Sequence, residues 1–327
     1  MMMIVLECGR EIKIIHIYIY MNYFDETKCK IISSRGILKS CDIKSLLPLS
    51  SVKDLQNYNF NKLTDKCTLY VCSSAIYFFM KNYIDKINCK FILVSGDDDS
   101  CCPRDMFTSR EEFLKFIENK KIIHWFAQNN VKEHSKITKI PIGLDYHTIS
   151  SNNYKSNNIN EIQITPIEQE KIILNIKNDS LPFWEREIKC YSNFHFVLEN
   201  KYCYDRRDAI EKIPPELIFY EPIRTTKETG FINQSKYAFV VSPHGNGLDC
   251  HRTWEAISLG CIVIVKTSEL DKLYEDLPVL IVKNWSDINI DLLKITVTNF
   301  KDKIFKYEKL LLKYWVDLIN LYKNNST

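Results

Sequence analysis

The sequence predicts an α/β protein of two domains, each with a parallel β-sheet, that face each other across a cleft. Three observations lead to this prediction. Apolar segments of strand length recur along the chain, several are apolar at nearly every position, and amphipathic segments separate them. Strands that are buried on both faces have continuous apolar runs, and alternation of strands with helices is typical of parallel sheets. With 327 residues, the chain is long enough for two cores.

The first half of the chain, residues 1–150, is expected to form the first of these domains. Its strand-length segments are residues 14–20, 68–80, 90–96, 121–127 and 137–143. Between them, residues 109–120 place Phe113, Phe116 and Ile117 on one face, which predicts a helix.

The second half is expected to begin after a polar linker, residues 151–160, which contains too few apolar side chains to order itself by burial. The second domain is expected over residues 161–300, with strand-length segments at 170–176, 194–198, 216–220, 237–242 and 261–265. Residues 301–327 are expected to be a terminal helix, because apolar residues recur at helical spacing over 303–323.

The composition is that of a globular protein without a membrane span. Hydrophobic residues make up 45% and charged residues 26%, and the net charge of +3 is too small to favour a nucleic-acid partner. No run of about 18 apolar residues occurs. Charged residues interrupt the first 24 residues, which predicts two short strands rather than an export signal. We therefore expect a cytoplasmic protein.

The 12 cysteines are scattered and include no Cys-x-x-Cys pair. Structural zinc sites commonly use such pairs, and disulfide frameworks are typical of small secreted chains. The cysteines are therefore expected to be reduced, and no metal site is predicted from them.

The segment 240–265, "VVSPHGNGLDCHRTWEAISLGCIVIV", predicts an anion-binding site. Only 8 glycines occur in the chain, yet Gly245 and Gly247 stand between a buried strand and a helix-like segment. Loop amides followed by a helix N-terminus bind anions, and ligands of parallel sheets bind at the carboxyl ends of strands. The dinucleotide fingerprint fails at Cys250, and the Gly-Lys-Ser/Thr of a P-loop is absent, so neither NAD nor ATP in its usual cradle is favoured.

Two charged residues of the expected helix extend this prediction. Arg252 and Glu255 are three positions apart and share a face. An arginine can bind diphosphate oxygens with two parallel hydrogen bonds, and a glutamate can accept hydrogen bonds from a ribose diol. A nucleotide-diphosphate sugar presents both groups. The alternative is a solvated ion pair worth less than about 0.5 kcal/mol.

The same segment resembles the C-terminal signature of exostosin-like glycosyltransferases: a Ser-Pro, a glycine-rich turn, Arg-x-x-Glu-Ala, and Gly-Cys-Ile before a hydrophobic strand. The resemblance implies a GT-B fold of two Rossmann-like domains and an inverting hexosyl- or pentosyltransferase that needs no metal. It also implies a nucleotide-sugar donor, with UDP-sugar favoured over GDP-sugar, a glycan or glycoconjugate acceptor, and no further cofactor. Members of that family usually carry a membrane anchor, and no segment of this sequence predicts one.

The resemblance also implies roles for individual residues. The donor diphosphate is expected near His244, Gly245, Asn246 and Gly247, with Arg252 on a phosphate and Glu255 on the ribose. Arg186, near an expected strand of the second domain, is a further candidate phosphate contact. Arg206, Arg207, Arg224 and Lys227 could assist, although solvated surface charge is expected for most of them.

An inverting transferase needs a base for the acceptor hydroxyl. The first domain offers two groups at strand ends: Asp97, Asp98 and Asp99, which follow the strand at 90–95, and Asp145 with His147. Asp97, Asp99 and His147 are the candidates for the base. Asp97-x-Asp99 also resembles the metal-binding Asp-x-Asp motif of the other major glycosyltransferase fold. The two residues could instead only cap the loop, and both alternatives stay open. Two other functions remain possible: a nucleotide-sugar-binding pseudoenzyme without a working base, and a structural or carbohydrate-binding α/β protein.

Overall fold

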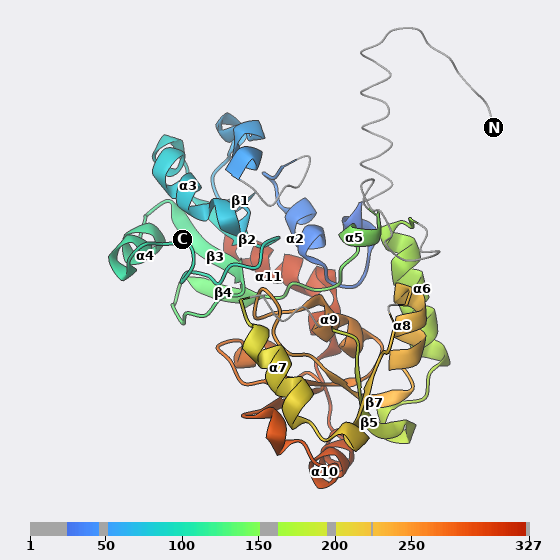
Figure 1. The fold of residues 1–327 in the computed structure, drawn as a ribbon. Coiled ribbons are helices and arrows are strands. Elements are labelled where there is room, and N and C mark those ends of the chain that lie inside the picture. The colour runs from blue at the N-terminus through green and yellow to red at the C-terminus, as the bar shows by residue number, and fades with distance from the viewer. Residues whose placement is uncertain (1–24, 46–51, 151–162, 195–200, 224, 325–327) are drawn as a thin grey trace, which may run out of the picture.

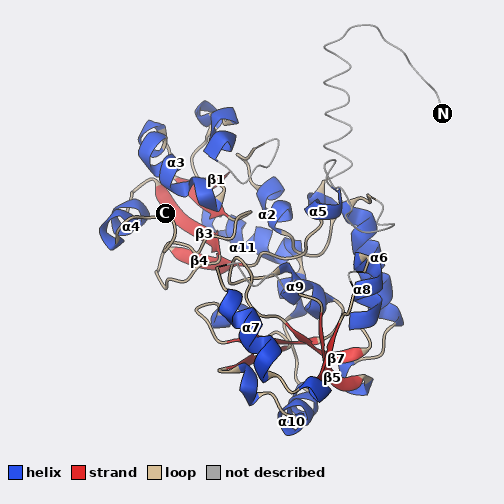
Figure 2. Cartoon of the chain, in the orientation of Figure 1, coloured by secondary structure: helices blue, strands red, loops and turns tan. Residues whose placement is uncertain are grey.

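The computed structural model describes residues 25–45, 52–150, 163–194, 201–223 and 225–324, which contain two separate parallel sheets (Figure 1). The predicted strands within 1–24, the linker at 151–160 and all but the first residue of the segment 194–198 lie outside the described residues. The prediction of an α/β fold with two parallel sheets is confirmed, and Figure 2 shows helices around both sheets.

The first sheet has four parallel strands in the order β1-β2-β3-β4: Cys67–Tyr70, Phe91–Ser95, Ile122–Gln128 and Ile137–Ile140. Successive residues of β2 point into different cores, as expected for a strand buried on both faces. Phe91 and Leu93 pack in one cluster with α3 (Ile76–Asn82) and α4 (Arg110–Ile117). Ile92 and Val94 pack in another with α2 (Ser34–Ser40) and the terminal helix α11 (Leu312–Asn324).

The second sheet has five parallel strands in the order β6-β5-β7-β8-β9, which are Ile218–Tyr220, Glu187–Ser192, Tyr237–Val241, Ile262–Lys266 and Val279–Val282. One face packs against α7 (Cys203–Lys212) and α10 (Ile290–Lys301). The other packs against α6 (Pro166–Asp179), α8 (Lys227–Gln234) and α9 (His251–Ser258). This second core is continuous with the one beneath α11, so a single apolar cluster joins the two sheets.

Short helical segments connect these elements. A single-turn helix, α5, spans His147–Ser150, and 3₁₀ helices occur at Glu26–Lys28, Val52–Asn57, Phe60–Lys62, Ser73–Ala75, Ile84–Lys86, Phe183–Glu185, Pro215–Leu217, Asp271–Tyr274, Trp285–Asp287 and Tyr307–Leu310.

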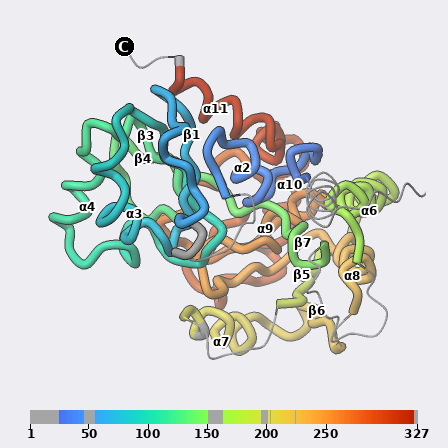
Figure 3. Tube along the Cα trace, turned by 90° about the horizontal axis from the view of Figure 1, so that it is seen from above, coloured from blue at the N-terminus to red at the C-terminus, as the bar shows by residue number. Residues whose placement is uncertain are grey.

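The end of the chain returns to the first sheet, where α11 lies beside α2 (Figure 3). Leu312 N donates to Lys30 O at 2.8 Å, and Ile32 N donates to Leu310 O at 2.8 Å. The helix predicted over 303–323 is therefore shorter than expected, because these bridges hold residues before Leu312 in an extended and 3₁₀ conformation.

Two apolar runs that predicted strands contain helices. Residues 170–176 lie within α6, where Thr165 and Glu168 form a capping box and Pro166 occupies the first turn. Of the run 68–80, only the start is a strand, since α3 begins at Ile76. Short apolar runs do not distinguish a strand from a buried helix, and the capping signal decides the first case.

No helix in the described ranges is long and apolar enough to cross a bilayer. The ten cysteines whose side chains the structure describes are free thiols, and most are buried.

Gly143 lies where the loop after β4 crosses residues 32 and 33. Its φ is +67°, and a Cβ there would lie 2.3 Å from the backbone oxygen of Ile32. Gly143→Ala is therefore expected to lower the free energy of unfolding by at least about 2 kcal/mol, from left-handed strain and the clash.

Urea denaturation checks this expectation, with Gly230→Ala as the matched control. A Cβ at Gly230 meets no atom closer than 3.6 Å and lies within a helix, so this change should be neutral or stabilise by up to about 1 kcal/mol. Equal stability of the two variants would contradict the strain at Gly143.

Candidate active site

A cleft of about 940 Å³ lies between the two sheets and is lined from both. The first sheet contributes the loops that follow β2 and β4, and the second contributes the loop after β7 and the start of α9. These are carboxyl ends of parallel strands, where ligands of α/β proteins bind. Of the residues predicted for the site, the cleft brings together Asp97, Asp99, His147, Gly245, Asn246, Gly247, Arg252 and Glu255.

The glycine-rich loop joins β7 to α9, and its turn is closed by a bond from Gly245 N to Gly247 O at 3.0 Å. A Cβ on Gly247 would lie 2.8 Å from Asn129 Nδ2 and 3.1 Å from Asp99 O. A Cβ on Gly245 would lie 3.0 Å from Arg206 Nη2. Glycine at these two positions thus lets the opposite loop and a guanidinium approach the backbone closely.

His244 does not line the cleft, in contrast to the prediction that it lies against the donor. It is 8% exposed, and its backbone N donates to Asp205 Oδ2 at 2.8 Å. Its Nδ1 lies 2.9 Å from Leu248 O, within the same loop. Because both groups are used internally, His244 fixes the shape of the loop.

Two arginines converge on this loop. Arg252 Nη2 donates to Pro243 O at 2.9 Å, and Arg206 Nε donates to His244 O at 3.2 Å. The Nε of Arg252 is buried and has no hydrogen-bond partner among the described residues. Burial, and also the charge of Arg206, lower the pKa of Arg252. An anion in the cleft would relieve this repulsion and supply the missing acceptor.

Glu255 faces the first domain from one turn further along α9. Its Oε1 lies 2.8 Å from Lys227 Nζ, and Lys227 also donates to the backbone oxygen of Asp145 across the cleft. Arg252 and Glu255 therefore do not form the isolated surface pair of the alternative interpretation, since both line the cleft.

The acidic loop after β2 supplies two carboxylates with different surroundings. Asp97 is paired with Arg35, whose Nε lies 3.2 Å from its Oδ1, and its side chain is only 6% exposed. Asp99 lines the cleft and keeps an exposed surface there. Neighbouring atoms nevertheless exclude part of the water around its carboxylate, and this desolvation, together with the charge of Asp98, raises its pKa. The two residues are therefore not equivalent as proton acceptors.

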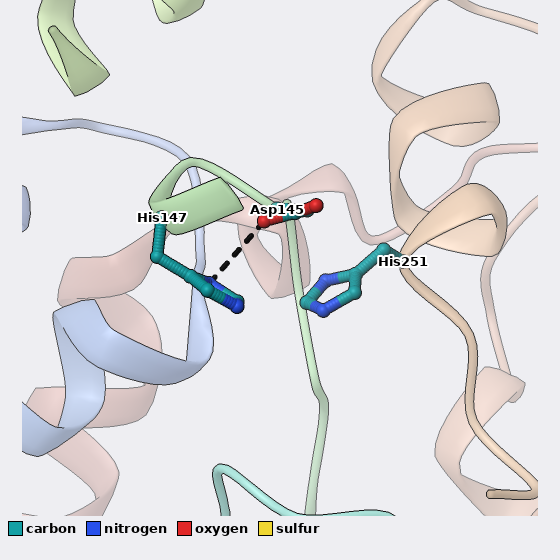
Figure 4. Close-up of side chains that lie close together, drawn as sticks. All are labelled: Asp145, His147 and His251. Carbon is teal, nitrogen blue, oxygen red and sulfur yellow. Dashed lines mark ion pairs between the residues drawn. The ribbon is translucent and has the colours of Figure 1, made fainter. Parts of the chain in front are cut away.

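His147 opens the single turn α5 and lies beside Asp145, with Nδ1 3.3 Å from Oδ1. Burial lowers the pKa of His147 to about 4, although the charge of Asp145 opposes the shift. Figure 4 shows His251, from the start of α9, on the other side of Asp145, with its ring turned toward that of His147. The two ring centroids are 5.7 Å apart.

Arg186 lies outside the cleft, so its placement at the donor site is corrected. Its Nη2 donates to Leu259 O at 2.9 Å, its Nε donates to Leu181 O, and its Nη1 lies 3.2 Å from Cys261 Sγ. The side chain thus binds the carbonyl of Leu259, the C-cap residue of α9, at the opposite end of that helix from Arg252.

Several cleft residues were not predicted as site residues or were expected on the surface. Arg206 and Lys227 line the cleft, Arg207 is exposed on α7, and Arg224 lies outside the described residues. Asp145, which was offered with His147 as a candidate base, also lines the cleft. Asp249 and His251 lie within two positions of the predicted Gly247 and Arg252, which could have indicated them. Arg35 belongs to a distant helix, and no local signal in the sequence marks it.

No protein-family model matches the chain, and no curated protein matches it in sequence. Among solved structures, an α1,3-fucosyltransferase with GDP-fucose is similar at 11% identity and a TM-score of 0.38, covering 89% of this chain and 96% of that one. An α,α-trehalose-phosphate synthase (UDP-forming) from Burkholderia xenovorans, in complex with glucose-6-phosphate, is similar at 9% identity and a TM-score of 0.36, covering 95% and 84%. At these TM-scores the similarity assigns neither a family nor an activity. The evidence for the two parallel sheets and for the cleft is the strand order and the residues that line the cleft.

Proposed function

We propose that the chain is a glycosyltransferase of the GT-B type, which moves a sugar from a nucleotide-diphosphate donor to a hydroxyl acceptor in this cleft. The observation that carries the proposal is the convergence of Arg206 and Arg252 on the glycine loop, where the buried Nε of Arg252 has no hydrogen-bond partner in the part of the chain that the structure describes. Two cations that repel each other at the carboxyl end of a strand favour a diphosphate as the ligand.

The donor is proposed to lie against the second domain. The amides of Asn246 and Gly247, with Arg206 and Arg252, bind the diphosphate, while Gly245 N closes the turn beside it, and Glu255 accepts hydrogen bonds from the ribose. The same cations stabilise the charge that develops on the leaving diphosphate, which is the larger part of their contribution to rate. A UDP-sugar is favoured over a GDP-sugar, with either a hexose or a pentose as the transferred group.

Asp99 is proposed as the base that takes the proton of the acceptor hydroxyl, with inversion at the sugar. Its raised pKa favours proton uptake, and it lines the cleft from the first domain, opposite the proposed diphosphate site. Asp97 is less suited, because its carboxylate is already paired with Arg35. His147 is less suited, because burial lowers its pKa from the ordinary value of an imidazole, whereas the pKa of Asp99 is raised.

A thermal-shift titration with UDP, GDP and their sugar conjugates tests the donor site. For the wild type, we expect stabilisation by one nucleotide that grows with the logarithm of its concentration once that concentration exceeds Kd. No shift with any diphosphate nucleotide at millimolar concentration would favour the structural or carbohydrate-binding alternative. Binding without transfer to any acceptor would favour the pseudoenzyme.

Asp99→Asn is expected to lower kcat by about 10²- to 10⁴-fold while leaving the Kd for the nucleotide sugar within about threefold. In the wild type, kcat/KM should rise with pH through the raised pKa of Asp99, because only the carboxylate accepts a proton. That limb of the pH profile should vanish in the variant.

Asp98→Asn is the matched control for this experiment. Asp98 belongs to the same loop, where its Oδ1 accepts from Ser100 N at 2.8 Å. An asparagine can still accept that bond, but it removes the charge that helps to raise the pKa of Asp99. Activity near the wild-type level is therefore expected on the pH plateau, with the acidic limb shifted to lower pH. If Asp99→Asn retained activity equal to the control, another group would have to be the base.

A further inference from the structure

A cluster of two histidines and one aspartate in the cleft has no role in the proposed transfer. Asp145, His147 and His251 each offer one ligand atom, and these atoms all lie within 4.8 Å of one another. Two of the residues follow β4 in the first domain, and the third opens α9 in the second (Figure 4). Within the described residues, no other such group of histidine, cysteine and acidic ligands occurs.

We propose that Asp145, His147 and His251 form a binding site for one divalent transition-metal ion, zinc or a close substitute such as cobalt, across the two domains. Imidazole nitrogens with one carboxylate are a ligand set that such ions take, with a fourth position left for water or substrate. The inference goes beyond the proposed function and does not depend on it. It also departs from the sequence-based expectation, which contained no metal.

The spacing of the first two ligands fits one ion. Zinc lies about 2.0–2.2 Å from nitrogen and oxygen ligands, so two ligands of a tetrahedral ion are about 3.3 Å apart. Asp145 Oδ1 and His147 Nδ1 are 3.3 Å apart, yet His147 Nδ1 is buried and forms no hydrogen bond with any described group. Two atoms that bind the same ion lie at this distance from each other and form no hydrogen bond between them.

The third ligand is oriented by a hydrogen bond of the kind that metal-binding histidines make. His251 Nδ1 lies 2.7 Å from the backbone oxygen of Gly143, which can only accept, so Nδ1 carries the proton. Nε2 therefore keeps its lone pair for an ion. Bringing three atoms within 4.8 Å to tetrahedral spacing needs a shift of roughly 1.5 Å, which side-chain rotation and small closure of the cleft supply.

The cluster contains one acidic side chain, Asp145, and two cations that line the same cleft are paired with other carboxylates. Lys227 pairs with Glu255 at 2.8 Å, and Arg35 pairs with Asp97 at 3.2 Å. These two ion pairs reduce the repulsion that a divalent cation would meet from Lys227 and Arg35.

Titration of the chelator-treated full chain with Zn²⁺ or Co²⁺ alone, without nucleotide, tests the site. Calorimetry should give one saturable equivalent, and cobalt should produce visible d–d absorption without an intense thiolate charge-transfer band. His147→Ala and His251→Asn are each expected to raise Kd at least about tenfold. The asparagine amide can still donate to Gly143 O, which preserves the loop contact.

His134→Ala is the matched control, because His134 also lies beside a carboxylate, 3.2 Å from Glu118, but outside the cleft. Its metal affinity should equal that of the wild type. Thermal unfolding without metal shows whether each variant is folded. No saturable binding by the folded wild type, or binding that persists in both cluster variants with a thiolate band, would overturn the proposal. Neither result would contradict the proposed donor site, because donor binding is measured separately, with nucleotides and no metal.

Discussion

Arg252→Ala is expected to lower kcat/KM for the nucleotide sugar by about 10²- to 10³-fold and to remove most of the thermal stabilisation by nucleotide diphosphate. The reason is the position of Arg252 at the glycine loop. Its buried Nε has no hydrogen-bond partner among the residues that the structure describes, and the positive charge of Arg206 acts on it. Each hydrogen bond from a guanidinium to a phosphate is charge-assisted, and it is stronger in a cleft that excludes part of the water. A water molecule in place of the lost guanidinium would bind the phosphate more weakly.

Arg207→Ala is the control, because Arg207 is exposed and does not line the cleft. It removes the same charge from the same domain and should change kcat/KM by less than twofold. Arg252→Lys separates charge from geometry: a lysine keeps the charge but cannot form two parallel bonds, so partial activity is expected. Steady-state kinetics and the nucleotide thermal shift measure all three variants. If Arg252→Ala and Arg207→Ala had equal kcat/KM and equal thermal shifts, the diphosphate would not bind at the glycine loop.

The part of the site that the sequence predicted is the part that is contiguous in the chain. Gly245, Gly247, Arg252 and Glu255 fall within a strand, a turn and one helix, so spacing alone places them together. Arg186 was predicted by a different argument, from its place after an expected strand, and it lies outside the cleft. It lies near the start of a strand, but it folds back onto the C-terminal end of α9 rather than toward its start. Proximity to an element in sequence does not say which end of a neighbouring helix a long side chain reaches.

The opposite wall of the cleft was harder to predict because it depends on how the domains pack. Arg35 comes from α2, and Lys227 opens α8, yet both face the cleft. The contact of Gly247 with Asp99 brings together residues far apart in the chain. No local pattern encodes such contacts. The parallel sheets, in contrast, follow from continuous apolar runs such as 237–242 and 261–265, which became β7 and β8.

Helix and strand were confused where the pattern was short and rich in isoleucine. Residues 170–176 resemble a strand in composition, but they continue a helix that Thr165 begins with a capping box. The strands β5 and β9 were not predicted, because Glu187–Ser192 carries charged residues at its start and Val279–Val282 is only a short apolar run. Capping signals would have been the better guide to the first error.

Asp249→Ala is expected to lower the free energy of unfolding by about 3–5 kcal/mol, because it removes an acceptor shared by several buried donors and each donor left unpaired costs about 1–3 kcal/mol. The carboxylate is 2% exposed and accepts hydrogen bonds from four groups. Ile142 N donates to Oδ2 at 2.8 Å from the first domain, and Trp254 Nε1, Tyr274 Oη and Cys250 N donate at 2.9, 3.0 and 3.0 Å. Alanine would leave these buried donors without an acceptor.

Urea denaturation measures this loss, and Asp302→Ala is the control, since Asp302 is exposed after α10 and should change stability by less than about 0.5 kcal/mol. The bond to Ile142 also ties the glycine loop to the wall of the cleft that carries Asp145 and His147. Asp249→Asn keeps one acceptor oxygen, so it should be less destabilising than alanine while still weakening nucleotide binding. If both variants were as stable as the control, the link between the domains would rest on the shared apolar cluster alone.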